Sequence, residues 1–219
     1  PRDKPCAGAI SQLGLDVLRE IGVVPTVPSL PMRGVRVIEG DAVGETESPM
    51  GIVVRRTEFD AELLRLAEKE GVEVREGQGL KAIARADGGW RLEVGEGETI
   101  DATFVAAADG AGSTTRKLLG LREPERKGHL YVLDTEETDA DAGVKRGLVD
   151  FDLSVLADGI AGYYWDFPTP LGGRNQVSRG IYDANLSRDK DANAKSVLAK
   201  ALARRGVDIE KTRLRPFST

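Results

Sequence analysis

The stretch at residues 106–116 constrains the fold most, because it joins an apolar strand end to a glycine-containing turn and then to a helix start. Asp109 and Gly110 lie in the turn, and Ser113 is a residue type preferred just before a helix. Glycines let the backbone approach a dinucleotide, and a helix N-terminus offers N–H groups to its phosphates. Arg116 falls in the first turn, where the helix dipole disfavours a cation, so a bound anion is one explanation for it. The alternative is a strand–turn–helix without a ligand.

Composition narrows the class of protein. The 219 residues are 40% hydrophobic and 31% charged, which suits one globular domain or two small ones. The net charge is −5, so we expect no nucleic-acid-binding surface. We find no stretch that could span a bilayer and no leader pattern, and therefore expect a cytoplasmic protein, with contact to a membrane surface left open. The single cysteine, Cys6, excludes an internal disulfide.

The pattern before residue 121 alternates helices and strands. It predicts a helix after Ser11, a second helix from Thr57 to Gly71, and a three-stranded meander over residues 80–108. The meander ends in a continuous apolar run at residues 104–108, which is typical of a strand covered on both faces in a parallel sheet.

The pattern after residue 121 favours an antiparallel sheet followed by a helix from Ser187 to about Arg205. The strands of this sheet are expected at residues 130–135, 147–153, 160–167 and 176–182. The predicted fold class is therefore α+β or α/β. It combines a partial Rossmann-type nucleotide-binding region with a β-meander, at residues 1–121, and an antiparallel substrate-binding region at residues 122–219.

The sequence lacks the residues that several common catalytic and metal-binding sites require. The only histidine is His129, so a Ser-His-Asp or Cys-His arrangement could use no other, and a structural histidine is the simpler interpretation. No spacing of cysteines and histidines suits zinc, so we predict no metal site. The sequence also contains no nucleophile elbow, no P-loop and no G-x-G-x-x-G.

Two motifs resemble the flavin-dependent oxidoreductases of the glutathione-reductase-type Rossmann class. Residues 56–60 read Arg-Thr-Glu-Phe-Asp and resemble the R-x-x-F-D segment, whose arginine reaches FAD in that family. Residues 108–116 resemble the A-D-G-A-x-S-x-x-R motif, which lies near the flavin ribose and pyrophosphate. The resemblance implies that FAD is bound by Arg56, Asp109, Gly110, Ala111, Ser113 and Arg116.

A third motif narrows the resemblance to geranylgeranyl reductases, which reduce isoprenoid double bonds. Residues 163–168 match their Y-x-W-x-F-P signature, and residues 4–8 resemble their K-x-C-x-G loop. The resemblance implies reduction of an isoprenoid by reduced flavin, with NAD(P)H as reductant and Cys6 as catalytic residue. It places the substrate against Tyr163, Trp165, Phe167, Pro168 and Gly180. The family's G-x-G appears here as Ser178-Arg179-Gly180.

The residues themselves leave alternatives open. Tyr163, Trp165 and Phe167 alternate along a strand and leave the same face, where they could line a substrate tunnel, lie under a flavin or pack in the core. A flavin monooxygenase or halogenase would share the first two motifs. Because the glycine fingerprint is missing, we expect an internal piece of a longer flavoprotein. Such a piece would bind FAD weakly or not at all, and could be a substrate-binding domain without activity alone.

Overall fold

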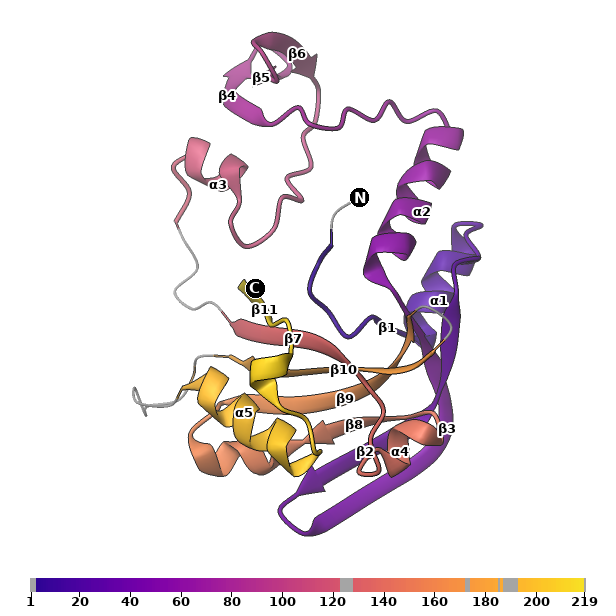
Figure 1. The fold of residues 1–219 in the computed structure, drawn as a ribbon. Helices are drawn as coiled ribbons and strands as arrows, with labels where there is room; N and C mark the ends of the chain where they lie inside the picture. The colour runs from indigo at the N-terminus through magenta and orange to yellow at the C-terminus, as the bar shows by residue number, and fades with distance from the viewer. Residues whose placement is uncertain (1–2, 123–127, 172–173, 185, 187–192, 219) are drawn as a thin grey trace. The chain divides into compact units, whose positions relative to one another are not determined.

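The computed structural model describes residues 3–122, 128–171, 174–184, 186 and 193–218. Figure 1 labels their helices and strands. In chain order these are β1 (Ala9–Ser11), α1 (Gln12–Glu20), β2 (Ser29–Glu39), β3 (Ala42–Val54), α2 (Arg56–Lys69), β4 (Leu80–Ala86), β5 (Gly89–Val94), β6 (Glu98–Ala102), α3 (Thr114–Leu118), β7 (His129–Glu136), α4 (Ala142–Lys145), β8 (Leu148–Asp152), η1 (Leu153–Asp158), β9 (Gly162–Leu171), β10 (Arg174–Asp183), α5 (Ala194–Arg204), η2 (Ile209–Lys211) and β11 (Arg215–Ser218).

The chain forms two compact units. The first, called here the sheet unit, combines residues 1–66 with residues 128–218, and the second, the meander unit, comprises residues 67–127. These bounds differ from the expected division at residue 121, because β2 pairs with β8 and so joins the N-terminal strands to the later ones. The functional division into residues 1–121 and 122–219 stays a prediction.

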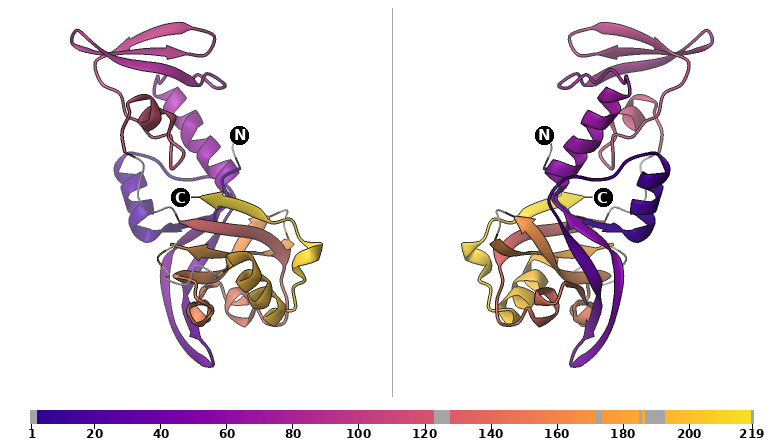
Figure 2. Two further views of the ribbon diagram at one scale, coloured as in Figure 1. Left: turned by 90° about the vertical axis from the view of Figure 1, so that its left-hand side faces the viewer. Right: turned by 90° about the vertical axis from the view of Figure 1, so that its right-hand side faces the viewer.

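The sheet unit contains one curled mixed sheet (Figure 2). Its described strands follow the order β1-β3-β2-β8-β9-β10-β7-β11. Neighbouring strands run antiparallel except β2 and β8, which pair in parallel from Gly34↔Leu148 to Ile38↔Asp152. The expected antiparallel sheet after residue 121 is therefore present, and three N-terminal strands extend it.

Helix α5 covers one face of this sheet. The Asn193 side chain accepts a hydrogen bond from the backbone N–H of Ser196 (3.1 Å) and so caps the helix. Residues at helical spacing, Val197, Leu198, Ala201 and Leu202, are buried against β7, β10 and η1. Sequence periodicity predicts this buried side correctly. The expected start at Ser187 lies outside the described residues.

The meander unit contains a separate antiparallel sheet in the order β4-β5-β6. Its last strand ends at Ala102, so the strand expected to continue through residues 104–108 is absent, and Phe104 is 89% exposed. No described strand pairs with this segment. An apolar run becomes a strand only where neighbouring strands accept and donate its backbone hydrogen bonds.

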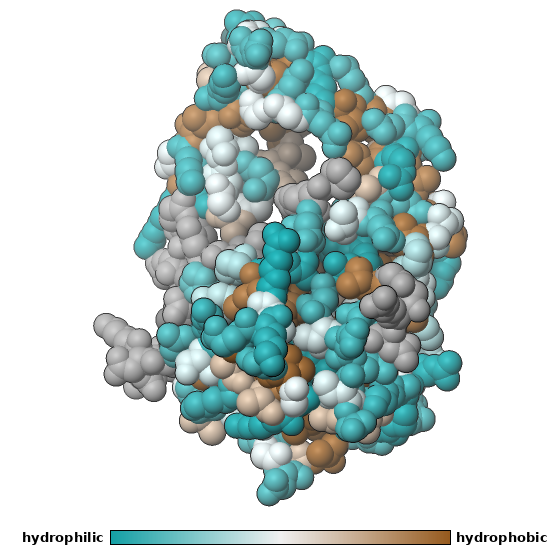
Figure 3. Space-filling view, in the orientation of Figure 1, coloured by the Kyte–Doolittle hydropathy of each residue, from teal (hydrophilic) through white to brown (hydrophobic). Residues whose placement is uncertain are grey.

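These sheets confirm the expected fold class, a mixture of α and β elements with a meander. Most of the face drawn in Figure 3 is hydrophilic, with apolar residues in small patches. Among the described helices, none has the length and apolar character that crossing a bilayer requires. Helix α1 buries no side chain and exposes Leu13 and Val17.

Candidate functional site

Alternate aromatic residues of β9, namely Tyr163, Trp165 and Phe167, occupy one face of the sheet, as their spacing predicts, and Tyr164 lies on the other face. The Phe151 ring of β8 meets Tyr163 and Phe167 edge to face, with centroid distances of 5.1 and 5.3 Å. The Tyr163 ring also packs against Trp165 and Tyr182, with centroid distances of 6.2 and 5.7 Å. We call Tyr163, Trp165 and Phe167 the aromatic stripe. Trp165 and Phe167 are buried in a core cluster, whereas Tyr163 is half-buried.

Gly180 of β10 supports the aromatic stripe directly. It lies opposite Trp165 in the β9–β10 register. A Cβ at this position would collide with the indole ring and with the backbone oxygen of Tyr131, so only glycine lets the ring approach the β10 backbone this closely. The structure therefore gives Gly180 a packing role, and its contact with substrate stays a prediction.

Cys6 lies in a loop that a backbone hydrogen bond joins to the sheet. The backbone N–H of Gly8 donates to Cys6 Sγ (3.4 Å), and Val54 N–H donates to the Gly8 carbonyl (3.0 Å). Gly8 has a φ of +85° and a Cβ there would collide with the Val54 carbonyl, so the loop requires glycine. Ala7, which follows Cys6 in the chain, packs against the core cluster that holds Trp165 and Phe167. Burial raises the pKa of Tyr163, and the Tyr182 and Cys6 side chains raise it further.

Arg56 is the first residue of α2. Its guanidinium donates two hydrogen bonds to Asp60, at 2.7 and 2.8 Å. These bonds raise the pKa of Arg56 against the effect of burial, and Cys6 raises it further. The structure thus brings together three predicted site residues from distant segments, namely Cys6, Arg56 and Tyr163.

Pro168 lies apart from this group. Side chains alternate across a strand, so Pro168 leaves the face opposite to Phe167. It lines an open hollow with Leu30, Pro31 and Gly147. Its predicted contact with substrate would therefore not be made from the aromatic stripe.

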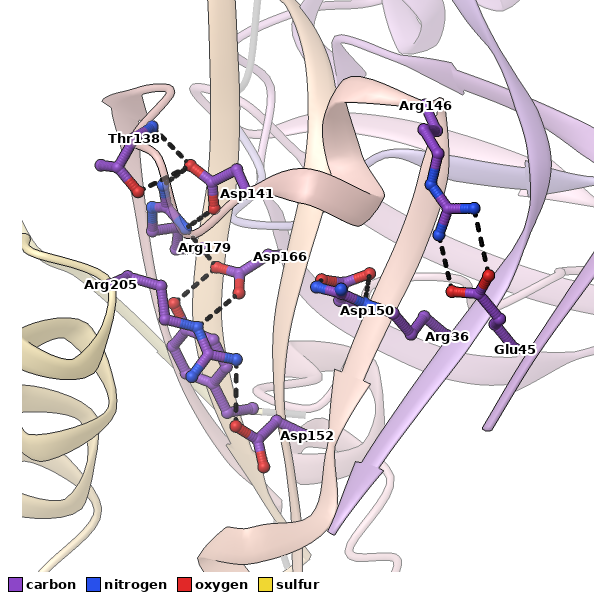
Figure 4. Close-up of polar contacts among 11 residues, drawn as sticks. Arg36, Glu45, Thr138, Asp141, Arg146, Asp150, Asp152, Asp166, Arg179 and Arg205 are labelled. Carbon is purple, nitrogen blue, oxygen red and sulfur yellow. Dashed lines mark hydrogen bonds and ion pairs between the residues drawn. The ribbon is translucent and has the colours of Figure 1, made fainter. Parts of the chain in front are cut away.

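The opposite face of the same strands carries a buried network of charges that the sequence analysis missed (Figure 4). Four residues directly opposite one another cross β2, β8, β9 and β10, in the order Arg36, Asp150, Asp166 and Arg179. Arg179 is fully buried and donates to Asp166 Oδ1 at 2.6 Å. Arg36 pairs with Asp150, whose pKa burial raises. We call these four residues the charge ladder.

Three further charged residues extend the ion pairs of the charge ladder on the face of the sheet that α5 covers. Asp141, which precedes α4, accepts from Arg179 at 2.9 and 2.6 Å. Arg205, at the end of α5, donates to Asp166 and to Asp152, both at 3.0 Å. Burial disfavours the charge of Arg179, but Asp141 and Asp166 outweigh this effect and raise its pKa. The ladder therefore ties β9 and β10 rigidly behind the aromatic stripe.

In the meander unit, the Asp109 turn is ordered by its own polar groups. Asp109 accepts hydrogen bonds from Ser113 Oγ (2.6 Å) and from Thr115 N–H (2.9 Å), and these bonds lower its pKa. Ser113 Oγ accepts from Arg116 N–H (2.9 Å), which confirms the expected cap. One Arg116 guanidinium N–H donates to the Ala111 carbonyl (2.7 Å). Helix α3 is short, and Arg116 closes the turn rather than projecting from it.

The donor chemistry of these segments fits a flavin nucleotide. A Cβ at Gly110, whose φ is +80°, would meet no described atom within 4 Å, so the backbone of this turn is open to a ligand. Arg56 offers a guanidinium suited to phosphate or to a carbonyl. Arg56 belongs to the sheet unit and Gly110 to the meander unit.

Comparison with known families decides the class. A family model described as FAD binding domain matches residues 2–155. The chain belongs to this FAD-binding family. A curated relative, the rifampicin monooxygenase of Streptomyces venezuelae, is 30% identical over 99 residues, which cover 41% of this chain and 21% of the relative.

Solved structures of flavoproteins share the fold. A geranylgeranyl bacteriochlorophyll reductase-like protein from Thermoplasma acidophilum matches 100% of this chain and 57% of its own, with 20% identity and a TM-score of 0.75. The halogenase PltM in complex with phloroglucinol and FAD matches 93% of this chain and 46% of its own, with 17% identity and a TM-score of 0.66. The chain thus spans about half the length of these two proteins.

Proposed function

We propose that this chain forms the substrate face and part of the cofactor site of an FAD-dependent oxidoreductase that reduces isoprenoid double bonds. The observation that carries the proposal is the aromatic stripe, which has the spacing of the geranylgeranyl reductase signature and belongs to a core cluster against which Ala7 of the Cys6 loop packs. The similarity of fold to the Thermoplasma acidophilum reductase-like protein supports the same assignment.

Groups with donor chemistry suited to the cofactor are present in each unit taken by itself. Arg56, with its guanidinium fixed by Asp60, and the Asp109 turn, with its open backbone at Gly110, have the donor chemistry for a nucleotide. The predicted contacts of Ala111, Ser113 and Arg116 belong to the same turn. Bound FAD, reduced by NAD(P)H, would supply the hydride that adds to the double bond.

The chain's own residues then provide binding, orientation and a proton. The aromatic stripe and Phe151 offer an apolar surface that excludes water from a prenyl chain. Reduction adds one hydride and one proton across the double bond, and we assign the proton to the Cys6 thiol. The Gly8 N–H that contacts Sγ, and the neighbouring Arg56, stabilise the thiolate left behind.

Oxygenation or halogenation is the second candidate function. The 30% identity to a rifampicin monooxygenase and the fold shared with halogenase PltM favour it. Both reactions need molecular oxygen, whereas reduction of a double bond does not. The response to oxygen therefore separates the two candidates.

The test uses the full-length protein, loaded with FAD, and supplies it with NADPH and a geranylgeranyl lipid under argon. Reduction should add two hydrogens to each double bond, detected by mass spectrometry, without oxygen. Oxygen uptake that depends on the lipid, with a hydroxylated product, would refute the proposal. Trp165→Ala should lower turnover more than flavin content, whereas Trp90→Ala, in the meander unit, should alter turnover little.

A further inference from the structure

The face that bears the aromatic stripe also holds buried polar atoms without a hydrogen-bond partner among the described residues. These atoms are Trp165 Nε1, Ser178 Oγ, Asp134 Oδ1 and Thr169 Oγ1. Trp165, Ser178 and Thr169 are at least 95% buried, with exposures of 4%, 1% and 1%. A buried polar atom without a partner loses its hydration and gains nothing in return, so several together on one face point to a group that binds there.

The strand register places three of these residues on the neighbouring strands β9, β10 and β7. Ser178 of β10 lies directly opposite Asp134 of β7 and opposite Phe167 of β9. Trp165, opposite Gly180, is the diagonal neighbour of Ser178. Directly opposed residues have Cβ atoms about 5 Å apart, and a side chain as long as tryptophan reaches a diagonal neighbour. The register therefore gathers the three residues in one region of this face, with Ser178 between the other two.

The chemistry of the three atoms selects the ligand group. Trp165 Nε1 only donates and Asp134 Oδ1 only accepts, while Ser178 Oγ can do either. The ligand group must therefore both accept and donate, as a hydroxyl does. Asp134 Oδ2 already accepts from Arg55 and Arg215, both at 2.9 Å, so the carboxylate charge is balanced locally. An anionic group would face the acceptor Oδ1, and a neutral hydroxyl would not be repelled.

We propose that Trp165 Nε1, Ser178 Oγ and Asp134 Oδ1 form a polar subsite that binds a neutral hydroxyl group of the substrate beside the aromatic stripe. This inference rests on the proposed function for the identity of the rest of the substrate. It makes the substrate an alcohol with an apolar body. The charge ladder closes the opposite face of the same strands, so the hydroxyl enters from the side of the stripe.

The test compares two probes by calorimetry with the FAD-loaded protein. The probes are geranylgeraniol and the hydrocarbon in which hydrogen replaces its hydroxyl. We expect the alcohol to bind about tenfold more tightly, the value of one well-made buried hydrogen bond. Trp165→Phe keeps a ring but removes the N–H, and Ser178→Ala removes the hydroxyl. Each should lower this preference about threefold to tenfold, while Trp90→Phe, a matched loss of an indole N–H in the meander unit, should leave it unchanged.

The outcomes separate this subsite from the proposed function. Equal binding of alcohol and hydrocarbon by the wild type, or a preference unchanged in both variants, would mean that a buried water satisfies these atoms, and would overturn the subsite. If neither prenyl probe binds, the isoprenoid substrate is wrong. The comparison is then made with p-cresol and toluene, where a preference for p-cresol that falls in Trp165→Phe supports the subsite and no preference overturns it.

Discussion

Replacing Arg179 with methionine removes a guanidinium from the centre of the charge ladder while filling much of its volume. Arg179 is fully buried and donates to Asp141, Asp166 and Thr135 at distances between 2.6 and 2.9 Å. In the variant, Asp166 keeps Arg205 and the Tyr164 hydroxyl as donors. Asp141 keeps only the hydrogen bonds from Thr138 among those that the structure shows.

The expected cost is that of leaving one buried carboxylate without its cation. Removing one partner of a buried ion pair costs about 3–5 kcal/mol. For a protein of this size, that corresponds to a fall in melting temperature of roughly 6–20 °C. The loss should shrink as the pH falls from about 7 towards 4, because the Asp141 carboxyl, no longer paired with Arg179, can then take up a proton.

Urea and thermal unfolding, followed by circular dichroism, measure this cost. The matched control is Arg146→Met, drawn in the same view (Figure 4). Arg146 pairs with Glu45 at 2.6 Å, but these side chains are 45% and 40% exposed. Such a pair contributes about 0–1 kcal/mol, so the control should lose little stability. If Arg179→Met were no less stable than Arg146→Met, the argument for a structural charge ladder would be wrong.

Three other changes give measurable outcomes. Gly180→Ala should cost about 1–3 kcal/mol in thermal unfolding, because its Cβ overlaps the indole ring above it; unchanged stability would contradict this packing. Burial acts to raise the pKa of Asp152, but hydrogen bonds and the charge of Arg205 outweigh this effect and lower it. Its stabilisation is present above the ordinary pKa of 3.8 and is lost as pH falls below it, so Asp152→Asn should flatten the acid side of a melting curve measured against pH. Gly8→Ala should loosen its loop and speed alkylation of Cys6 by iodoacetamide. An unaltered rate would contradict the role given to Gly8 in holding this loop against the sheet.

The local features of the site could be predicted from sequence because they depend on near neighbours. Ser113 caps α3 by its residue type and position, and alternation alone puts Tyr163 and Trp165 on one face. The buried side of α5 follows from helical spacing in the same way. These predictions need only the three or four residues on either side.

The charge ladder could not be predicted, because its members lie far apart in the chain. Arg36 and Asp150 pair across 114 positions, and each looks like an ordinary exposed polar residue in its own strand. The run at residues 104–108 failed for the opposite reason, since its composition suits a strand but the described residues supply no partner. Long-range pairing decides both cases, and residue type does not encode it.

The parallel pairing of β2 with β8 has a consequence for how the chain folds. The sheet unit cannot close until residues 148–152 are available to residues 34–38, and the whole meander unit lies between them in sequence. During synthesis on a ribosome, β1, β2 and β3 therefore lack the rest of their sheet until the meander unit and β8 have been made. Contacts of such wide separation slow folding, although each doubling of the intervening length adds only about 0.6 kcal/mol of closure entropy.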